Sequence, residues 1–181
     1  VFSQKSVTIK DNVPQHIFSY NEIEAYEDRD GKLTLEDIRH PAVSARFQPS
    51  KTYTPKIFNL NSYHWFRIKI KPNPDSEQHW ILEFFDQTID DITLFVPDEN
   101  NNYSSYKFGD TYNFKEREYK HKNFTYNLKN DTAAEKTYYI RLKSSQSASV
   151  IVVLRSVKRF LEYAVEEYLF FGLFYGMILV F

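Results

Sequence analysis

Six residues of the chain have the types and spacing that a sugar-binding surface uses. Each occupies the parity opposite to the apolar residues of its predicted strand: Trp65, Arg67, Glu83, Phe85, Tyr139 and Arg141. Aromatic rings stack on the apolar C–H faces of sugars, and Arg and Glu side chains bind hydroxyl groups with paired hydrogen bonds. The same residues could instead form ordinary cross-strand ion pairs with half-buried aromatic rings. The sequence leaves both interpretations open.

A second group of residues has part of the pattern of a calcium-binding loop. Asp28, Asp30 and Asp37 surround Gly31, but the first ligand position falls on Tyr26 and the twelfth position is Asp instead of Glu. We therefore expect a β-turn followed by a short capped helix, and the three aspartates are only a weak candidate for a metal site. The five histidines have no spacing typical of metal ligands, and we expect no cofactor.

Composition argues against several other classes of function. With only 4 glycines in 181 residues, the chain has little material for glycine-rich phosphate loops, and no Gly-x-Ser-x-Gly motif is present. The 23 basic and 24 acidic residues give a net charge of −1, which argues against a nucleic-acid partner. The absence of cysteine excludes disulfides. We expect that this chain is not an enzyme.

The elements that would position these residues are mostly short strands. Apolar and polar residues alternate, and aromatic residues make up 18% of the chain, as is typical of β-structure. The predicted strands are residues 7–10, 17–26, 65–71, 80–85, 92–96, 103–108, 124–128, 138–142 and 150–157. A helix is predicted from Leu35 to about His40, ended by Pro41. The pattern predicts an all-β, two-sheet antiparallel sandwich of about eight strands, without a helix longer than two turns before residue 155.

The order of the strands suggests one specific pairing. If residues 65–71 and 79–85 form a hairpin, Arg67 lies opposite Glu83 and Trp65 lies opposite Phe85. Cross-strand pairs of this kind contribute about 0.2–1 kcal/mol each. In the alternative arrangement, the two consecutive strands belong to opposite sheets of the sandwich.

The C-terminal residues are helical in pattern and increasingly apolar. Residues 158–167 are amphipathic, and residues 168–181 carry no charge. A helix over the uncharged part would span about 21 Å, which is shorter than a hydrocarbon core of about 30 Å. It could be a buried core helix, but we expect the first part of a transmembrane helix. In isolation the exposed rings should drive formation of a homodimer, with Gly172 and Gly176 near the contact.

Six segments occur in an order that resembles one known family. They are residues 27–37 with Thr34-Leu35-Glu36-Asp37, 64–73 with Trp65-Phe66-Arg67, 80–95, 108–124 with Gly109-Asp110 and His121-Lys122-Asn123-Phe124, 138–142 with Tyr138-Tyr139-Ile140-Arg141, and 171–176. Together they resemble the type-two periplasmic sensor domain of bacterial seven-transmembrane receptors with diverse intracellular signalling modules. The resemblance covers about residues 20–181. Arg117, which lies in the fourth segment, joins the candidate ligand-binding residues.

The resemblance implies both a fold and a role. The fold would be a jelly-roll, galactose-binding-like sandwich over residues 1–157, followed by a juxtamembrane and first transmembrane helix over residues 158–181. The implied role is an input domain in signal transduction, such as two-component signalling, at the periplasmic or extracellular face of the bacterial inner membrane. Its partners would be a small-molecule ligand, suspected to be a carbohydrate, and the membrane. Kinase or cyclase modules would lie outside this chain.

A second class of protein shares the order of these strands. A carbohydrate-binding accessory domain of a secreted glycoside hydrolase has a similar pair of strands around a Trp-x-Arg sequence. Such a domain has no reason to end in the apolar run of residues 168–181. We therefore expect the sensor domain and keep the accessory domain as the alternative.

Overall fold

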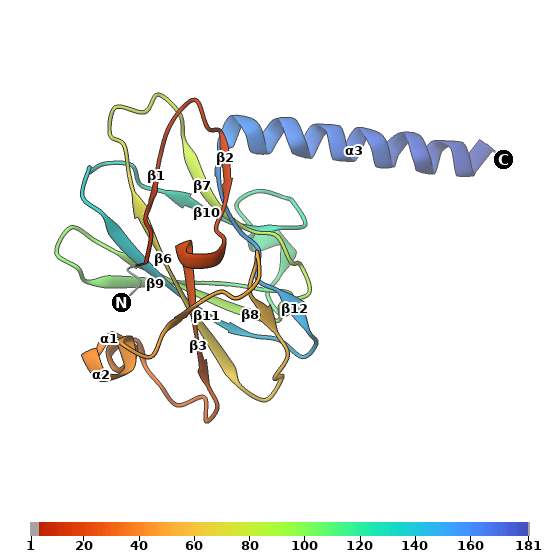
Figure 1. Cartoon of the computed structure of the whole chain (residues 1–181). Coiled ribbons are helices and arrows are strands. Elements are labelled where there is room, and N and C mark those ends of the chain that lie inside the picture. The colour runs from red at the N-terminus through yellow and green to blue at the C-terminus, as the bar shows by residue number, and fades with distance from the viewer. Residues whose placement is uncertain (1–3, 181) are drawn as a thin grey trace.

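The structure is a computed structural model that describes residues 4–180, and it shows two packed β-sheets with one long helix leaving them (Figure 1). The larger sheet has the order β4 (Gln48–Pro49), β3 (Ile23–Asp28), β6 (Tyr63–Lys71), β11 (Lys136–Lys143), β8 (Asp91–Pro97) and β9 (Tyr103–Phe108), and β1 (Val7–Thr8) also pairs with β6. The smaller sheet has the order β10 (Phe124–Leu128), β7 (Trp80–Phe84), β13 (Val152–Ser156) and β2 (Gln15–Ile17). A separate pair consists of β5 (Lys56–Ile57) and β12 (Ala148–Ser149).

The main core lies between the two sheets. Alternate residues of β6 and β7 meet there and are at most 2% exposed: Phe66, Ile68, Ile70, Trp80, Leu82 and Phe84. The predicted all-β sandwich is confirmed, and β1, which runs parallel to β6, is a departure from the antiparallel pattern. Strand β13 is buried along its whole length, and it begins with three apolar residues and ends with the buried polar residues Arg155 and Ser156.

The predicted hairpin between residues 65–71 and 79–85 is wrong. Strand β6 belongs to the larger sheet and β7 to the smaller one, so neither Arg67 and Glu83 nor Trp65 and Phe85 are cross-strand neighbours. Both strands carry a strongly apolar face, and these two faces are buried against each other across the core. In the sheet, Arg67 lies opposite Glu24 on β3 and Tyr139 on β11.

Short helices cover part of the outer face of the larger sheet. Helix α1 (Leu35–Arg39) begins at the predicted capping box, in which the amide of Thr34 donates to Asp37 Oδ2 at 2.8 Å. Pro41 does not simply end this helix, because it begins α2 (Pro41–Ser44), where the fixed φ of proline suits a first turn. The predicted strand 17–26 is divided by the 3₁₀ helix η1 (Tyr20–Glu22), which lies between β2 and β3.

Helix α3 (Val157–Val180) projects from the sandwich as a straight rod (Figure 1). Its first turns dock on the sandwich through the buried side chains of Phe160 and Ala164. From Leu169 to Val180 every residue is exposed. Among the described residues before position 155, the longest helix is α1 with 5 residues, in agreement with the sequence.

Candidate ligand-binding pocket

The structure brings only part of the predicted sugar-binding group together. Four of its residues share the outer face of the larger sheet, where Arg67 lies opposite Tyr139 and Trp65 lies opposite Arg141. Glu83 and Phe85 are on and beside the smaller sheet. The expectation of one exposed face is therefore wrong, because period-2 alternation places a residue on a face of its strand without indicating the sheet.

The shared outer face is also largely closed. Trp65 is fully buried, with its ring stacked on Phe95 at a centroid distance of 5.5 Å, and Phe47 and Ile38 complete this second hydrophobic cluster. Tyr139 is 7% exposed and packs against Phe47. These rings stabilise the contact between the sheet and the segment that contains α1 and α2.

The two arginines of this face have different surroundings. Arg67 forms an ion pair with Glu24, donates to Ser44 Oγ at 2.7 Å and lies over the ring of Phe47. It thus holds α2 against the sheet. Arg141 is half-buried, and its guanidinium carbon lies 5.1 Å from the centroid of the Tyr63 ring and 5.8 Å from that of Trp65.

Glu83 is fully buried in the smaller sheet and is part of a polar network. Its Oε1 accepts a hydrogen bond from Asn123 Nδ2 at 2.6 Å. Its Oε2 lies 3.1 Å from Arg155 Nε, an ion pair without hydrogen-bond geometry. A buried carboxylate needs such partners, since an unpaired buried charge is strongly unfavourable. Glu83 is therefore not accessible to a ligand in this conformation.

The three aspartates of the weak calcium-site candidate lie at the end of β3, in the loop that follows it and in α1, and two of their carboxylates bind backbone amides. The carboxylate of Asp28 accepts hydrogen bonds from the amides of Gly31 and Leu33 at 3.0 Å each, and Asp37 caps α1. Within residues 4–180 no group of three His, Asp or Glu side chains is arranged to hold a metal ion. Asp28, Asp30 and Asp37 therefore act in a turn and a helix cap instead of converging on a cation.

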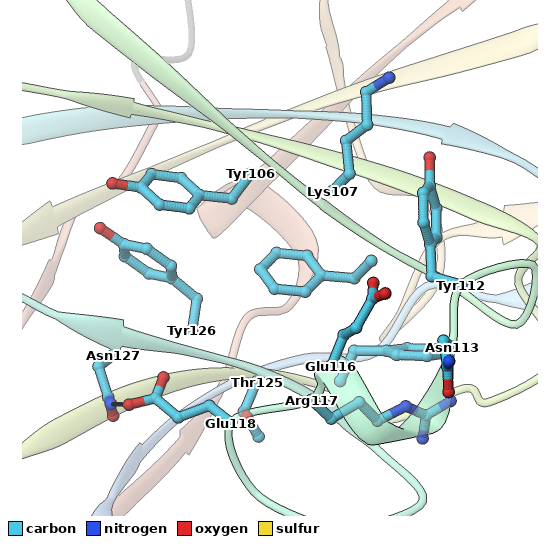
Figure 2. A pocket seen from close by; sticks show the side chains of 13 residues that line it. Tyr106, Lys107, Tyr112, Asn113, Glu116, Arg117, Glu118, Thr125, Tyr126 and Asn127 are labelled. Atoms are coloured by element: carbon cyan, nitrogen blue, oxygen red, sulfur yellow. Dashed lines mark hydrogen bonds between the residues drawn. The ribbon is translucent and has the colours of Figure 1, made fainter.

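One cavity lies at an edge of the sandwich, between the two sheets. Strands β9 and β10 are edge strands of the two sheets, and their inward-facing aromatic residues line a cavity of about 280 Å³. The walls include Tyr106, Phe108, Phe124 and Tyr126, and a 3₁₀ helix, η2 (Phe114–Glu116), and the residues after it close the far side (Figure 2). Apolar walls with a few polar groups are typical of ligand sites.

Two tyrosines form the centre of this edge. The rings of Tyr106 and Tyr126 have centroids 4.7 Å apart at an angle of 53°, and Tyr106 is 39% exposed (Figure 2). Burial raises the pKa of the Tyr126 hydroxyl, so this group is protonated at neutral pH and able to donate a hydrogen bond. The exposed ring of Tyr106 thus offers an aromatic surface, and the ring of Tyr126, which is 8% exposed, supports it from behind.

Charged and amide groups lie opposite the rings. Asn127 donates to Glu118 and accepts from the hydroxyl of Tyr119 at 3.3 Å. The carboxylate of Glu116 points into the space beside the rings (Figure 2). Arg117 also lines the cavity, and burial lowers the pKa of its guanidinium. Of the predicted ligand-binding residues, Arg117 alone lies here.

A second cavity continues the edge beyond the tyrosines. It has a volume of about 310 Å³ and shares Tyr106 and Tyr126 with the first cavity. Its polar residues include Asp98, Lys129 and the pair Lys136–Asp131, whose Nζ and Oδ1 are 3.1 Å apart. The two cavities therefore form one groove along β9 and β10, which we call the edge groove.

The comparison with known proteins decides the family. The model of the 7TMR-DISM extracellular 2 family matches residues 20–156. The chain belongs to this family. The 7TMR-DISM extracellular 2 domain is an extracellular, non-catalytic sensor domain of seven-transmembrane receptors, so the resemblance seen in the sequence is confirmed.

Other similarities are weak. No curated protein matches the chain. The enzymatically active domain of tailspike protein 4 of bacteriophage CBA120 has a TM-score of 0.30 at 10% identity, covering 79% of this chain and 18% of the tailspike chain. A carbohydrate-binding module specific for non-crystalline cellulose has a TM-score of 0.27 at 12% identity, covering 60% of this chain and 74% of the module.

Helix α3 agrees with an extracellular domain that is attached to a membrane. Within the described residues it is the one helix that is long and apolar enough to cross a bilayer, with a mean hydropathy of 1.4 in its most apolar window. Only 6% of the residues in that window are buried against the rest of the 7TMR-DISM extracellular 2 domain. A core helix of a soluble protein would be mostly buried, so α3 has the character of a membrane-anchoring segment.

Sequence analysis missed most residues of the edge groove. Tyr106 and Tyr126 have the parity of core residues, and the position of Tyr106 on an edge strand exposes its ring, whereas Tyr126 stays buried. The available signal was the choice of Tyr instead of an aliphatic residue at inward positions of both strands. Glu116 and Glu118 lie in and after η2, where the sequence has no periodicity, and Asn127 is a polar residue at an outward position of the predicted strand 124–128.

Proposed function

We propose that this domain senses a carbohydrate chain bound in the edge groove. The observation that carries the proposal is the exposed ring of Tyr106, packed on the buried ring of Tyr126 and facing polar side chains across an open cavity. Aromatic rings bind the apolar faces of sugar rings, while carboxylates and amides bind hydroxyl groups. The proposed location is the periplasmic face of the bacterial inner membrane, and the proposed outputs are cytoplasmic signalling modules outside this chain.

Charge and size both favour a neutral chain of sugars. The first cavity is lined by two carboxylates, Glu116 and Glu118, and two cations, Lys107 and Arg117, so it has no net charge to select an ionic ligand. Its volume of about 280 Å³ is near the lower end for ligand pockets. A ligand that also fills the second cavity must cross the tyrosine pair, as an oligosaccharide would.

The first test is binding of hexasaccharides to the whole chain in detergent micelles, measured by titration calorimetry. The probes are cellohexaose, laminarihexaose and maltohexaose, with glucose as the short reference. We expect at least one hexasaccharide to bind more tightly than glucose. Tyr106→Ala should weaken this binding about tenfold, because loss of one stacking surface costs roughly 1.4 kcal/mol.

Two variants are the controls for this test. Tyr53→Ala removes a tyrosine that is 52% exposed and distant from the groove, and it should leave the affinity unchanged. Arg141→Met tests the outer face of the larger sheet. Loss of binding in Arg141→Met with normal binding in Tyr106→Ala would place the site on that face and contradict the proposal. So would the absence of binding to all three hexasaccharides.

A further inference from the structure

One segment touches both the edge groove and helix α3. Residues 117–123, which we call the clamp segment, connect η2 with β10. At its start, Arg117 and Glu118 line the first cavity. The following residues contact the docked part of α3, where the ring of Tyr119 lies 5.2 Å from that of Phe160 and Tyr168 donates to the carbonyl of Lys120. The clamp segment therefore has a face toward the ligand site and a face toward the helix.

His121 is the centre of the contact with α3. It is 2% exposed, and its ring lies edge-on to Phe160 at 5.1 Å and to Tyr163 at 5.7 Å. The amide of Asn123 donates to Nδ1 at 3.2 Å, so the neutral imidazole carries its proton on Nε2. That nitrogen is 3.3 Å from Glu167 Oε2 and donates to it.

The carboxylate of Glu167 has several polar contacts at this docking surface. Lys122 forms an ion pair with its Oε1, and the hydroxyl of Tyr163 donates to its Oε2 at 3.2 Å. The carboxylate is thus bound by two residues of the clamp segment and one of the helix itself. It is the last charged residue before the exposed apolar part of α3.

Arg117 connects the two faces of the clamp segment. Its Nη1 donates to the carbonyl of His121 at 2.9 Å and to that of Lys122 at 2.7 Å, which are the two residues that hold Glu167. The guanidinium lies 4.4 Å from the centroid of the Phe124 ring, in the cavity wall, and its Nε is buried without a partner among residues 4–180. This buried donor lacks an acceptor, so a ligand oxygen would satisfy it once the guanidinium turns toward the cavity.

We propose that the clamp segment transmits occupancy of the edge groove to helix α3, with Arg117 as the positioning residue. That a sugar in the groove starts the signal rests on the proposed function. The contact between the clamp segment and α3 does not depend on it. A ligand oxygen that binds Nε draws the guanidinium toward the cavity and moves Nη1 away from the carbonyls of His121 and Lys122. The carbonyls then shift, and with them the two side chains that hold Glu167. Groove and helix are coupled because each favours one arrangement of the same segment.

The link is tested first without any ligand, by hydrogen exchange of the whole chain in micelles. Arg117→Lys keeps the charge but loses the fixed fork that donates to two carbonyls. We expect the amides of residues 160–167 to exchange at least tenfold faster in this variant. Arg46→Lys is the matched control, since Arg46 lies over the ring of Tyr26 and lines neither cavity of the edge groove, and exchange should stay within twofold.

A second variant changes α3 and measures the effect on the clamp segment. Glu167→Gln removes the charge that Lys122 and His121 bind, and it should raise the exchange of residues 117–123 at least tenfold. If neither Arg117→Lys nor Glu167→Gln changes exchange across the contact by more than twofold, the link is overturned. Because no ligand is used, this outcome is independent of whether a sugar binds.

The ligand arm uses the hexasaccharides named above. Glu167 does not line the edge groove, so Glu167→Gln can change sugar affinity only through the clamp segment. We expect at least a fivefold change in affinity, together with altered exchange of residues 160–167 when sugar binds the wild type, as reciprocity requires. Unchanged affinity would overturn the coupling. If no hexasaccharide binds the wild type, the proposed function fails and the ligand-free variants still decide the link.

Discussion

Replacing Arg155 with methionine should lower the free energy of unfolding by about 3–5 kcal/mol. Arg155 is 4% exposed and is the cation paired with Glu83, which is fully buried in the smaller sheet. The variant leaves a buried carboxylate with only the amide of Asn123 as its partner. Urea unfolding of the chain in mild detergent, followed by tryptophan fluorescence, measures the change.

Two further variants isolate the buried charge as the cause. Adding Glu83→Gln to Arg155→Met should recover much of the loss, since both charges are then absent. Arg159→Met disrupts a solvent-exposed pair with Glu162, whose side chains are 41% and 48% exposed, and should cost less than about 1 kcal/mol. Equal stability of the Arg155→Met and Arg159→Met variants would show that Glu83 does not depend on its partner.

Removal of residues 169–181 should change the association state of the chain completely. Large apolar side chains of α3 are exposed in this part, including Phe170 at 70% and Leu179 at 87%. Five of residues 169–181 are aromatic, and each ring can bury about 150–250 Å². Soluble monomers rarely expose apolar patches larger than a few hundred Å². In buffer without detergent, we expect the intact chain to form a homodimer and the shortened chain to be a monomer.

Light scattering coupled to size-exclusion chromatography distinguishes these states. Gly172→Leu is the matched variant, because Gly172 has open space around its Cα and a larger side chain is tolerated in the single chain. If Gly172 lies at the contact between helices, this variant weakens the homodimer without unfolding the sandwich. An intact chain that stays monomeric without detergent would contradict both the dimer and the membrane role of α3.

The sequence was sufficient to predict which residues of several strands face the core between the sheets. Residues 66, 68 and 70 of β6 and residues Val152 and Leu154 of β13 lie there as their patterns indicate. The capping box of Thr34 and Asp37 was visible because its residues are three apart in the sequence. These features depend on local geometry, which a single sequence carries.

The assignment of strands to sheets could not be predicted in the same way. A period of two residues distinguishes inside from outside but does not show which strand is the neighbour. Arg67 was therefore placed opposite Glu83, although its partners in the structure are Glu24 and Ser44. Trp65 was expected to be exposed because nothing in its own strand shows that Phe47 and Ile38 cover it.

The edge groove could not be predicted either, because its prediction also requires the order of the strands in each sheet. Tyr106 and Tyr126 are ordinary inward-facing residues until β9 and β10 are known to be edge strands. The contact between His121 and Glu167 joins residues 46 positions apart and follows no periodic pattern. The matched family segment around His121 indicated that this region matters, but only the structure relates it to α3.

The most direct test of the account is a hydrogen-exchange map of the whole chain in micelles, with and without the hexasaccharide that binds most tightly. The account predicts that the sugar slows exchange in residues 104–108, 113–118 and 124–127, around the edge groove, and alters exchange in residues 160–167 of α3. Protection confined to residues 63–67 and 139–143, on the outer face of the larger sheet, would contradict it.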